Sequence, residues 1–487
     1  MKFHPFFTTR SIRIIPVILI ALCLALPAGS TADVLDRTTS AVSANKKTWR
    51  PPQLIGTDDV KSQRLKIAFN AAGDIIAVWV QPNNDLGTLW GNRYDAGQGW
   101  QKAQRIETND TAYAWSSQVA MDGAGNVILA WREDDGGKIR ARHYKTDRGW
   151  QKARLIKKKP WLSFIKTEDT GSAGDLQIAM NEAGNAVAVW FQSDESRSEK
   201  KLRLKYYTAG SGWDNGESSL INLGGNIMVS DLRVAIDRTG NAVAVWQQEE
   251  NGIESLWANR YEVGKGWQQP KLIENNKRTA WNHEIAADKA GNIIVVWQQS
   301  RWDGYNIWAN HYAAGSGWKG AQRINNNAPG CAEPPEIAFD GAGNALAIWS
   351  ECQRGKERAD LWFNRYVAGG GWQTAQRIDT DDTGFAYHPD IAFDGAGNAL
   401  AAWSQCNGRP DVFLNHCNIW ASRYVPGIGW EKVQPITIDA DNAERPQIAV
   451  DTAGNALVIW RQTDKTRCGG SFCYDDSVYE IWAARYE

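Results

Sequence analysis

Three loops of the chain carry an aromatic residue at the same place, four residues before the aliphatic residue of an expected strand. These aromatics are Trp115, Trp281 and Tyr387. An aromatic face can stack on a sugar ring, and neighbouring amides and imidazoles can hydrogen-bond the groups at its rim. The candidate ligand contacts are therefore Tyr113, Trp115, Trp281, His283, Trp302, Phe385, Tyr387 and His388, with Asn282 beside them. Their alternative role is to brace neighbouring loops.

Charged residues or glutamines stand one residue before the same aliphatic position. The eight residues at this place are Lys66, Gln118, Gln177, Arg233, Glu284, Glu336, Asp390 and Gln447. If their strand is innermost in the fold, they surround the mouth of a central channel. Glu284, Glu336 and Asp390 could then supply the two carboxylates that glycoside hydrolysis requires. The alternative is a solvated channel lining, because an enzyme needs unlike residues in one constellation and these come from a repeated position.

Other signatures of catalysis are missing from the sequence. It contains no Gly-rich phosphate loop, no nucleophile elbow and no HExxH motif. The sequence therefore restricts the enzymatic alternatives to chemistry that carboxylates and imidazoles can perform.

The elements that must position these residues are written eight times. A short apolar run, as at Ile448 to Val450, is followed by Asp-x-x-Gly-Asn or a close variant, and then by an apolar run that ends on Trp. Gly and Asn suit a tight turn because they tolerate positive φ and cap it locally, so each copy predicts a β-hairpin of strands A and B. The copies end at Trp79, Trp131, Trp190, Trp246, Trp297, Trp349, Trp403 and Trp460. A period of roughly 50 to 60 residues is typical of propellers and related arrays.

Each repeat continues with a strand C, as at Ile307 to Tyr312, and a strand D that begins at Gly-Trp. Strands A, B and C occur eight times after Leu65, but only seven D strands follow them. The missing D strand is found at Trp49 to Ile55, ahead of the first repeat. We expect it to pair beside Ile481 to Tyr486 and to close a ring, because closure leaves no long exposed edge. The predicted fold is all-β: an eight-bladed β-propeller of four-stranded antiparallel blades, with residues 49–487 as a single domain.

This arrangement resembles the ring closure of β-propellers. The pattern Asp-x-x-Gly-Asn-(x)4-Trp is distantly similar to the Asp-box of sialidase-like propellers and to other secreted bacterial propeller repeats. It departs from the Ser-x-Asp-x-Gly-x-Thr-Trp order of sialidase Asp-boxes, and the loops show no arginine cluster near a Tyr and a Glu of the kind that sialidase chemistry would use. The resemblance therefore implies an architecture and leaves the family open.

Repeated residues are interpreted as scaffold. The Trp residues of strands B and D should pack between blades. Strand C is less uniform, because its Trp is replaced by Arg140 and Arg203, which a fully buried position should not tolerate. Each Asp-x-x-Gly-Asn offers one carboxylate and one amide, too few for a calcium cage, so we interpret it as a turn. The Gln or Glu two places after each strand-B Trp should satisfy backbone groups.

Loop lengths indicate which side of the fold carries function. The A–B and C–D turns are short and open on one side of a four-stranded meander. The D–A and B–C connections are long and variable and share the other side, and function is often carried by such loops on a rigid scaffold. The candidate aromatics and all cysteines after the leader fall in or beside these long loops.

The N-terminus has the layout of a signal peptide. Residues 1–32 contain Lys2, Arg10 and Arg13, then an apolar run and small residues before the expected mature start at Asp33; a signal anchor is the alternative. Residues 33–48 should be a flexible lead-in. The formal charge of -1 becomes about -4 when three basic residues are removed, which does not favour nucleic acid or an anionic membrane.

Six cysteines remain once Cys23 is removed with the leader. In an exported chain this even number predicts disulfides. Their short spacing suggests Cys331 with Cys352, Cys406 with Cys417, and Cys468 with Cys473. A metal site is the alternative, but only His416 stands beside a cysteine, so we expect no metal and no cofactor.

We therefore expect a secreted or periplasmic, non-enzymatic binding or scaffold protein that recognises a glycan or protein ligand through its long-loop face. The alternative is a carbohydrate-active enzyme, a glycoside hydrolase or lyase, with its site at the channel mouth. We expect a monomer with no nucleic-acid partner and no membrane insertion after the signal is removed.

Overall fold

The computed structural model describes residues 47–56, 63–83, 86–107, 114–133, 138–157, 172–194, 199–214, 219–225, 227–274, 278–301, 304–326, 330–353, 358–378, 384–408, 416–438, 440, 442–463 and 479–487. The chain divides into two compact units, Met1–Lys46 and Lys47–Glu487, and the described residues belong to the second. The predicted signal peptide and nearly all of the predicted lead-in lie outside the described residues and stay predictions. Among the described residues no helix is long and apolar enough to cross a membrane.

The described elements are all β-strands. The A strands are β2 (Gln63–Phe69), β7 (Ala114–Met121), β12 (Ala173–Met180), β17 (Met228–Ile236), β22 (Ala280–Ala287), β27 (Gly330–Ala332) with β28 (Glu336–Phe339), β33 (Phe385–Phe393) and β38 (Ala443–Val450). The B strands are β3 (Ile75–Asn83), β8 (Val127–Glu133), β13 (Ala186–Ser193), β18 (Ala242–Glu250), β23 (Ile293–Arg301), β29 (Ala345–Gln353), β34 (Ala399–Cys406) and β39 (Ala456–Thr463). The C strands are β4 (Leu86–Asp95), β9 (Ile139–Lys145), β14 (Glu199–Thr208), β19 (Ile253–Glu262), β24 (Gly304–Ala313), β30 (Ala359–Val367), β35 (Cys417–Val425) and β40 (Tyr479–Tyr486).

Strand D is shorter than predicted and is split in two wherever it follows strand C. The pieces are β5 (Gly99–Trp100) and β6 (Gln104–Arg105); β10 (Gly149–Trp150) and β11 (Arg154–Lys157); β15 (Gly212–Trp213) and β16 (Ser219–Gly225); β20 (Gly266–Trp267) and β21 (Lys271–Leu272); β25 (Gly317–Trp318) and β26 (Gln322–Arg323); β31 (Gly371–Trp372) and β32 (Gln376–Arg377); β36 (Gly429–Trp430) and β37 (Gln434–Pro435). In the first repeat Trp100 pairs with Tyr94 but Gln104 pairs with Gly91, so strand D holds one extra residue. Such a bulge interrupts the ladder of hydrogen bonds, which explains the division.

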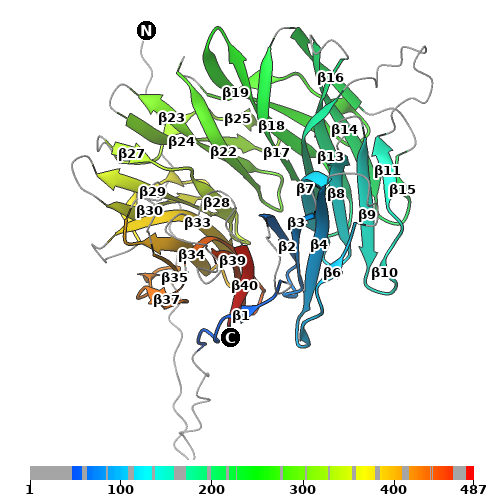
Figure 1. The fold of residues 1–487 in the computed structure, drawn as a ribbon. Coiled ribbons are helices and arrows are strands. Elements are labelled where there is room, and N and C mark those ends of the chain that lie inside the picture. Colours follow the sequence, from blue (N-terminus) through cyan, green and yellow to red (C-terminus); the bar gives the residue numbers. More distant parts are fainter. Residues whose placement is uncertain are drawn as a thin grey trace, which may run out of the picture. The chain divides into compact units, whose positions relative to one another are not determined.

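The strands pair antiparallel in the predicted order A, B, C, D. One exception joins two of these four-strand units, because β30 and β33 share a single parallel pair, Ala359 with Phe385. Figure 1 shows the sheets following one another in chain order, and the colours run from blue through green and yellow to red.

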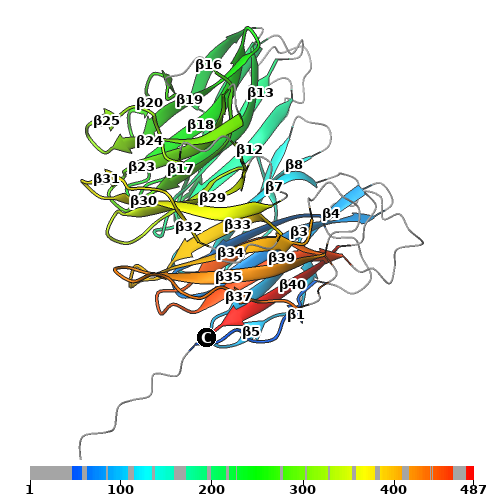
Figure 2. The same ribbon diagram turned by 90° about the vertical axis from the view of Figure 1, so that its left-hand side faces the viewer.

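The N-terminal strand β1 (Gln53–Leu54) pairs with the last strand, β40. Gln53 lies opposite Ala483, and an isolated bridge joins Trp49 to Tyr486. The rings of Trp49 and Tyr486 lie 5.2 Å apart, which repeats the Trp–Tyr contact between strands D and C elsewhere, such as Trp100 on Tyr94 at 5.5 Å. The predicted pairing of the N-terminal segment with the last C strand is confirmed, and Figure 2 shows β1 beside β40.

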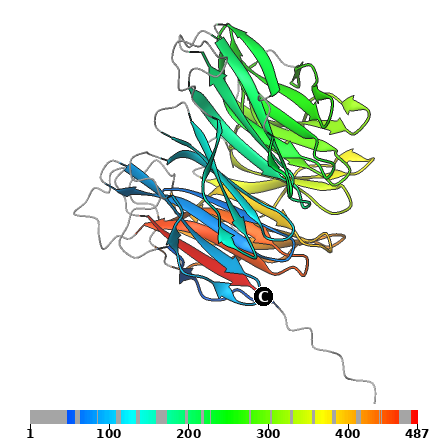
Figure 3. The same ribbon diagram turned by 90° about the vertical axis from the view of Figure 1, so that its right-hand side faces the viewer.

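The hydrophobic core lies between consecutive sheets. Each of the eight clusters of buried residues in the described part of the chain contains one strand-B Trp and combines side chains from two neighbouring sheets. The cluster around Trp79 combines the first sheet with the last, since Ile75 packs there with Leu457. Figure 3 shows the blue strands of the first sheet next to the orange and red strands of the last.

The strand-B Trp residues are 0 or 1% exposed, as their predicted packing role requires. Their indole N–H groups also explain the Gln or Glu two residues later. Trp403 Nε1 donates to Gln405 at 2.9 Å, and Trp349 Nε1 donates to Glu351 at 3.0 Å. The polar residue at this position therefore accepts from the indole in six repeats, whereas the indole N–H of Trp79 has no partner among the described residues.

The strand-D Trp residues are half-buried, and each packs against one of the clusters between two sheets, as predicted. In the first two repeats they also lie edge-on against the Tyr of their own sheet. One scaffold prediction needs correction. Arg203 occupies a strand-C position that is only 2% exposed, so burial there does tolerate arginine. A long side chain can bury its aliphatic stem while its guanidinium finds polar partners, which explains the difference.

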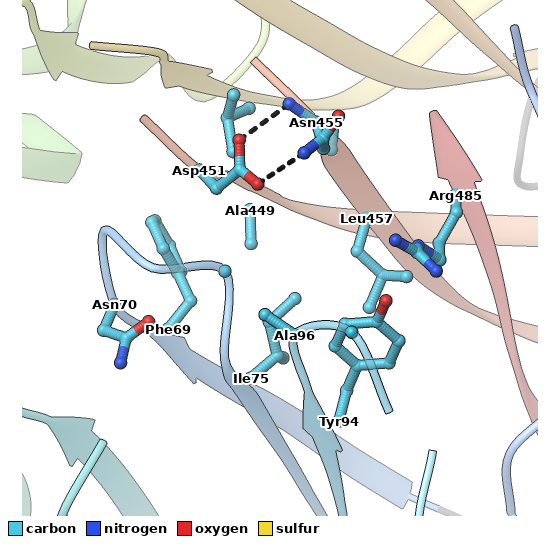
Figure 4. Close-up of a pocket in the computed structure, with 14 residues that line it drawn as sticks. Phe69, Asn70, Ile75, Tyr94, Ala96, Ala449, Asp451, Asn455, Leu457 and Arg485 are labelled. Carbon is cyan, nitrogen blue, oxygen red and sulfur yellow. Dashed lines mark hydrogen bonds between the residues drawn. The ribbon is translucent and has the colours of Figure 1, made fainter. Parts of the chain in front are cut away.

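The turn residues behave as predicted. Asp451 accepts a hydrogen bond from the backbone N–H of Asn455 at 2.8 Å and another from its side-chain amide at 2.7 Å (Figure 4). The same figure shows a small cavity of about 90 Å³ between the first and last sheets, lined by Phe69, Tyr94 and Arg485. Arg485 stacks over Tyr94 at 5.1 Å, as Arg93 does over Tyr144 at 4.9 Å in the next pair of sheets. The cavity therefore belongs to a repeated sheet-to-sheet contact.

Candidate functional site

The A strands contain a repeated bulge that the sequence did not reveal. A residue three places before the strand-A aliphatic has positive φ in seven repeats, and the register of the A–B pair shifts there. These residues are Arg64, Ser116, Asp175, Asp231, Asn282, His388 and Arg445, with φ between 43° and 55°. Pro334 stands at this place in the remaining repeat, and because proline cannot adopt positive φ the strand is divided there into β27 and β28.

Such strain is costly, about 1 to 3 kcal/mol for each non-glycine residue with a rare backbone conformation. Strained residues and bulges are concentrated next to functional sites, where they redirect side chains. The bulge lies two residues before the position of Lys66, Glu284 and Asp390, so it controls where these charged groups point.

A strands of consecutive sheets lie against one another. A cavity of about 320 Å³ is lined by residues of β2, β7, β33 and β38, among them Lys66, Gln118, Asp390 and Gln447. We call the five charged residues at the repeated A-strand position, Lys66, Arg233, Glu284, Glu336 and Asp390, the mouth cluster; Lys66 and Asp390 line this cavity. The predicted channel-mouth residues are thus partly brought together, because the charges of Glu284 and Glu336 both act on Lys66 from other sheets.

Arg233 organises one side of the mouth cluster. Its Nε donates to Glu284 at 2.8 Å, on the next sheet, and its Nη1 donates to Asp231 at 2.6 Å. The opposite oxygen of Asp231 lies 3.5 Å from His283 Nδ1. One guanidinium therefore bridges two carboxylates of adjacent sheets, a geometry that suits arginine's planar fork.

The other two carboxylates have no arginine of this kind. Burial raises the pKa of Glu336 well above its usual range, and the charges of Glu284 and Asp390 raise it further. Burial also raises the pKa of Asp390 to about 6, although the N–H groups of Ile448 and Ile391 donate to it and oppose the rise. The protonated forms of Glu336 and Asp390 are thus favoured relative to a free carboxyl, while Glu284 is paired with a cation.

Lys66 faces these acids from the first sheet. It is exposed to the cavity, but enclosure by the surrounding strands and the charge of Arg233 lower the pKa of its amine. An amine with a lowered pKa, beside carboxyls with raised ones, is a pattern found at sites of proton transfer.

The predicted aromatic contacts differ in accessibility. Trp281 is half-buried and meets the ring of Tyr305 edge-on, with centroids 5.3 Å apart. Tyr305 is 42% exposed, and the sequence-based candidates omitted it. Phe385 and Tyr387 are stacked 5.8 Å apart, but Phe385 is only 5% exposed and supports Tyr387 instead of offering its own face. Among the candidate aromatics whose side chains the structure describes, together with Tyr305, a ligand can therefore reach Trp281, Tyr305 and Tyr387.

We had expected His283 to contact a ligand, but it does not lie at an accessible surface. Its side chain is 0% exposed at a position where neighbouring repeats carry apolar residues such as Leu232, and its Nε2 lies 3.3 Å from the carbonyl oxygen of Val245. Burial lowers the pKa of His283 to about 4, although Asp231 opposes the shift. We therefore remove His283 from the ligand contacts.

His388 is half-buried at the bulge of β33. Burial, followed by the charges of Arg445 and Arg461, lowers the pKa of His388 to about 4. Its Nδ1 has no hydrogen-bond partner among the described residues. Arg445 and Arg461 were not among the sequence candidates, because only the fold brings β33, β38 and β39 together at this place.

Several candidates lie outside the described residues: Tyr113, Trp302, Cys468 and Cys473, with the side chains of Trp115 and Cys331.

Cys406 and Cys417 form the predicted disulfide. Cys352 is also disulfide-bonded, and Cys331 lies opposite it in the β27–β29 register. Within the described part of the chain no group of three or more His, Cys, Asp or Glu side chains is arranged to hold a metal ion.

No protein-family model matches the chain, and no curated protein matches its sequence. Among solved structures, the chain is similar to a protein of unknown function from Dyadobacter fermentans, at 12% identity and a TM-score of 0.42, over 91% of this chain and 99% of that one. It is also similar to an ulvan lyase of polysaccharide lyase family PL25, at 10% identity and a TM-score of 0.46, over 74% and 90% of the two chains. A third likeness is to the NanB sialidase of Streptococcus pneumoniae, at 10% identity and a TM-score of 0.36, over 90% and 71%. At these identities and TM-scores none of the three assigns a family or an activity to this chain.

Proposed function

We propose that this protein is an exported carbohydrate-active enzyme, a hydrolase or lyase, whose site is the mouth cluster. The observation that carries the proposal is the set of three carboxylates at one repeated position of three consecutive sheets. Two of them, Glu336 and Asp390, have raised pKa values, and the third, Glu284, accepts a hydrogen bond from Arg233. Carboxyl groups whose environments differ in this way can act as a proton donor and a proton acceptor in one site.

Glu336 is the best candidate for the general acid, since burial and two neighbouring carboxylates favour its protonated form. Glu284, which pairs with the guanidinium of Arg233, is the corresponding candidate for the proton acceptor. Asp390 is the second candidate for an acid in the mouth cluster. Carbohydrate is the favoured substrate because aromatic rings stand on the same strands as the acids. Trp281 precedes Glu284 on β22, and Tyr387 precedes Asp390 on β33, each by three residues.

Export is supported by the Cys406–Cys417 disulfide, because disulfides persist in oxidising compartments.

We further propose that the scaffold is an eight-bladed propeller closed by β1. The cluster around Trp79 and the Trp49–Tyr486 contact support closure. Removal of residues 33–56 should then leave the edge of β40 unpaired and cause association. A truncated protein that stays monomeric with unchanged melting would contradict closure.

The test of the activity is a screen of the purified exported chain on neutral and acidic polysaccharides, with detection of both new reducing ends and unsaturated products. Glu336→Gln should lower turnover by about 100-fold or more, as expected on removal of a general acid, and should leave binding intact. Glu182→Gln is the matched control, because Glu182 lies on the A–B turn side and its side chain is 58% exposed. Equal turnover by Glu336→Gln and the wild type would reject the assignment of the acid.

The second candidate function is binding without catalysis, which the sequence favoured. The repeated placement of Trp281 and Tyr387 supports it, because several similar weak contacts can act together. Retention of a polysaccharide with no cleavage of any member of the panel would favour this function over the enzyme.

A further inference from the structure

A group of basic side chains gathers at the mouth between β33, β38 and β39. Arg445 and His388 occupy equivalent bulge positions on adjacent A strands, with φ of 53° and 48°. The backbone N–H of Arg445 donates to Ser404 Oγ at 3.1 Å, which fixes the bulge of β38 against the neighbouring sheet. The geometry holds the two residues together at an energetic cost, as is common where a ligand is bound.

The positive charges of this group exceed the nearby negative ones. Arg461 Nη2 lies 3.2 Å from Glu444 Oε1, and the guanidinium stacks 4.4 Å from the centre of the Tyr479 ring. The exposed Arg445 makes no ion pair with any described residue. The Nε of Arg461 and the Nδ1 of His388 have no hydrogen-bond partner in the described part of the chain. The one carboxylate of this group thus pairs with Arg461 alone, and unused polar atoms remain beside the two guanidinium groups.

Electrostatics agree with this count of charges. Desolvation and then the charge of Arg461 lower the pKa of Arg445, because the positive charge of Arg461 disfavours a second cation beside it. Both arginines also contribute to the low pKa of His388. A bound anion would relieve the repulsion.

The basic group lies on the strands that carry one acid of the mouth cluster. Asp390 follows His388 by two residues on β33, and its Oδ2 accepts the N–H of Ile448, three residues after Arg445 on β38, at 2.8 Å. A ligand whose acidic group reached Arg445 would therefore extend over Asp390. The mouth thus has a basic end next to its acidic end.

We propose that Arg445, Arg461 and His388 form an anion subsite that selects saccharides carrying a carboxylate or a sulfate group. The inference rests on the proposed carbohydrate site and defines its substrate class. Arginine suits both groups because its planar donors match their oxygens in pairs, and His388 adds a neutral ring nitrogen at neutral pH. Tyr387, adjacent to His388, provides the ring on which the sugar can stack.

Binding of three labelled tetrasaccharides to the exported chain tests the inference: a tetragalacturonate, a sulfated galactan tetrasaccharide and neutral galactotetraose. We expect the anionic probes to bind about tenfold or more tightly than the neutral one, because each charge-assisted hydrogen bond contributes at about that level. Binding of the carboxylate or of the sulfate probe supports the inference and distinguishes the two sources of negative charge. Equal binding of all three probes, or binding of none, overturns it.

Arg445→Gln and Arg461→Gln should each weaken binding of the anionic probe about tenfold or more. Arg148→Gln is the matched control, because Arg148 is 74% exposed on a C–D turn and pairs only with Asp147 in the described structure. Unchanged affinity in both mouth variants, verified as folded by their melting, also overturns the inference.

Failure of this inference is distinguishable from failure of the proposed activity. If the protein prefers the anionic probes but cleaves no polysaccharide, the anion subsite is supported and the proposed catalytic activity is rejected. If the protein cleaves a neutral polysaccharide and Arg445→Gln does not change the rate of cleavage, the catalytic activity is supported and the anion subsite is rejected.

Discussion

Trp246 and Glu284 belong to neighbouring sheets of one array, yet their positions vary very differently between repeats. The Trp246 position is Trp in all eight copies, and each of these side chains is buried between two sheets. The Glu284 position holds Lys, Gln, Arg, Glu or Asp, and four of these residues, Lys66, Gln118, Asp390 and Gln447, line the cavity between A strands. Repetition of the first kind maintains the spacing of sheets, because close packing accepts few changes in shape. Variation at the Glu284 position places unlike charges on a scaffold that otherwise repeats, and so creates a site.

The two ends of the A strands show the same contrast. At the A–B turns Asp or Asn side chains cap a tight turn in each repeat, as Asp122 caps its turn through Asn126. At the bulged ends the equivalent residues include arginine, serine, aspartate, asparagine and histidine. Regular hydrogen bonding thus stabilises one end, while strained backbone supports chemical variety at the other. Four variants test this division.

Trp246→Ala should produce the largest effect. Removing a fully buried Trp leaves a cavity between two sheets, and the free energy of unfolding should fall by about 3 to 5 kcal/mol. Denaturant unfolding followed by Trp fluorescence measures it. A fall below about 1 kcal/mol would mean that the sheets can collapse around the cavity, and the packing role assigned to the strand-B set would be wrong.

The second prediction concerns the long-loop side. Cys406 and Cys417 are separated by 11 residues, so Cys406→Ser with Cys417→Ser should lower the free energy of unfolding by about 3 kcal/mol at most. The melting temperature under non-reducing conditions checks this value. Reductant should produce the same shift in the wild type, and a double variant that melts like the wild type would contradict a stabilising role.

The third prediction uses pH to separate the acids of the mouth from the buried imidazoles. A carboxyl with a raised pKa in the folded state contributes stability that is complete below its unfolded pKa and is lost as the pH rises through the folded value, about 6 for Asp390. Asp390→Asn should therefore gain stability relative to the wild type as the pH rises from 4 to 7. His283 and His388, lowered to about 4, act oppositely in both proteins, so their effect cancels in the comparison. Melting temperatures of the two proteins across this range measure the difference; a difference that does not change with pH would contradict the raised pKa.

Trp281→Ala should have the smallest effect on stability. The ring is half-buried and its edge-on contact with Tyr305 contributes about 0.5 to 1.5 kcal/mol, so melting should change little while affinity for a glycan falls. The matched comparison is Trp246→Ala, the same substitution in the core. A steep loss of melting temperature with unchanged binding per folded molecule would assign Trp281 to the scaffold.

The sequence alone determined the local elements of this protein. The hairpin of Asp451 and Asn455, the burial of Trp460 and the origin of the last D strand at Trp49 all follow from nearby residues or from the comparison of repeats. Turn chemistry and strand alternation depend on neighbours in the chain, and eight copies of one pattern reinforce each prediction.

Only the tertiary structure decided which side chains meet at the mouth. Arg233 reaches Glu284 on the next sheet, His283 is buried instead of exposed, and Arg445 approaches His388 because two bulges coincide. Each of these contacts joins residues that are tens of positions apart or depends on a positive φ at a non-glycine residue. The packing of the surrounding sheets maintains these positive-φ conformations, because the same residues would adopt ordinary φ values in an isolated strand. The local sequence therefore does not predict them.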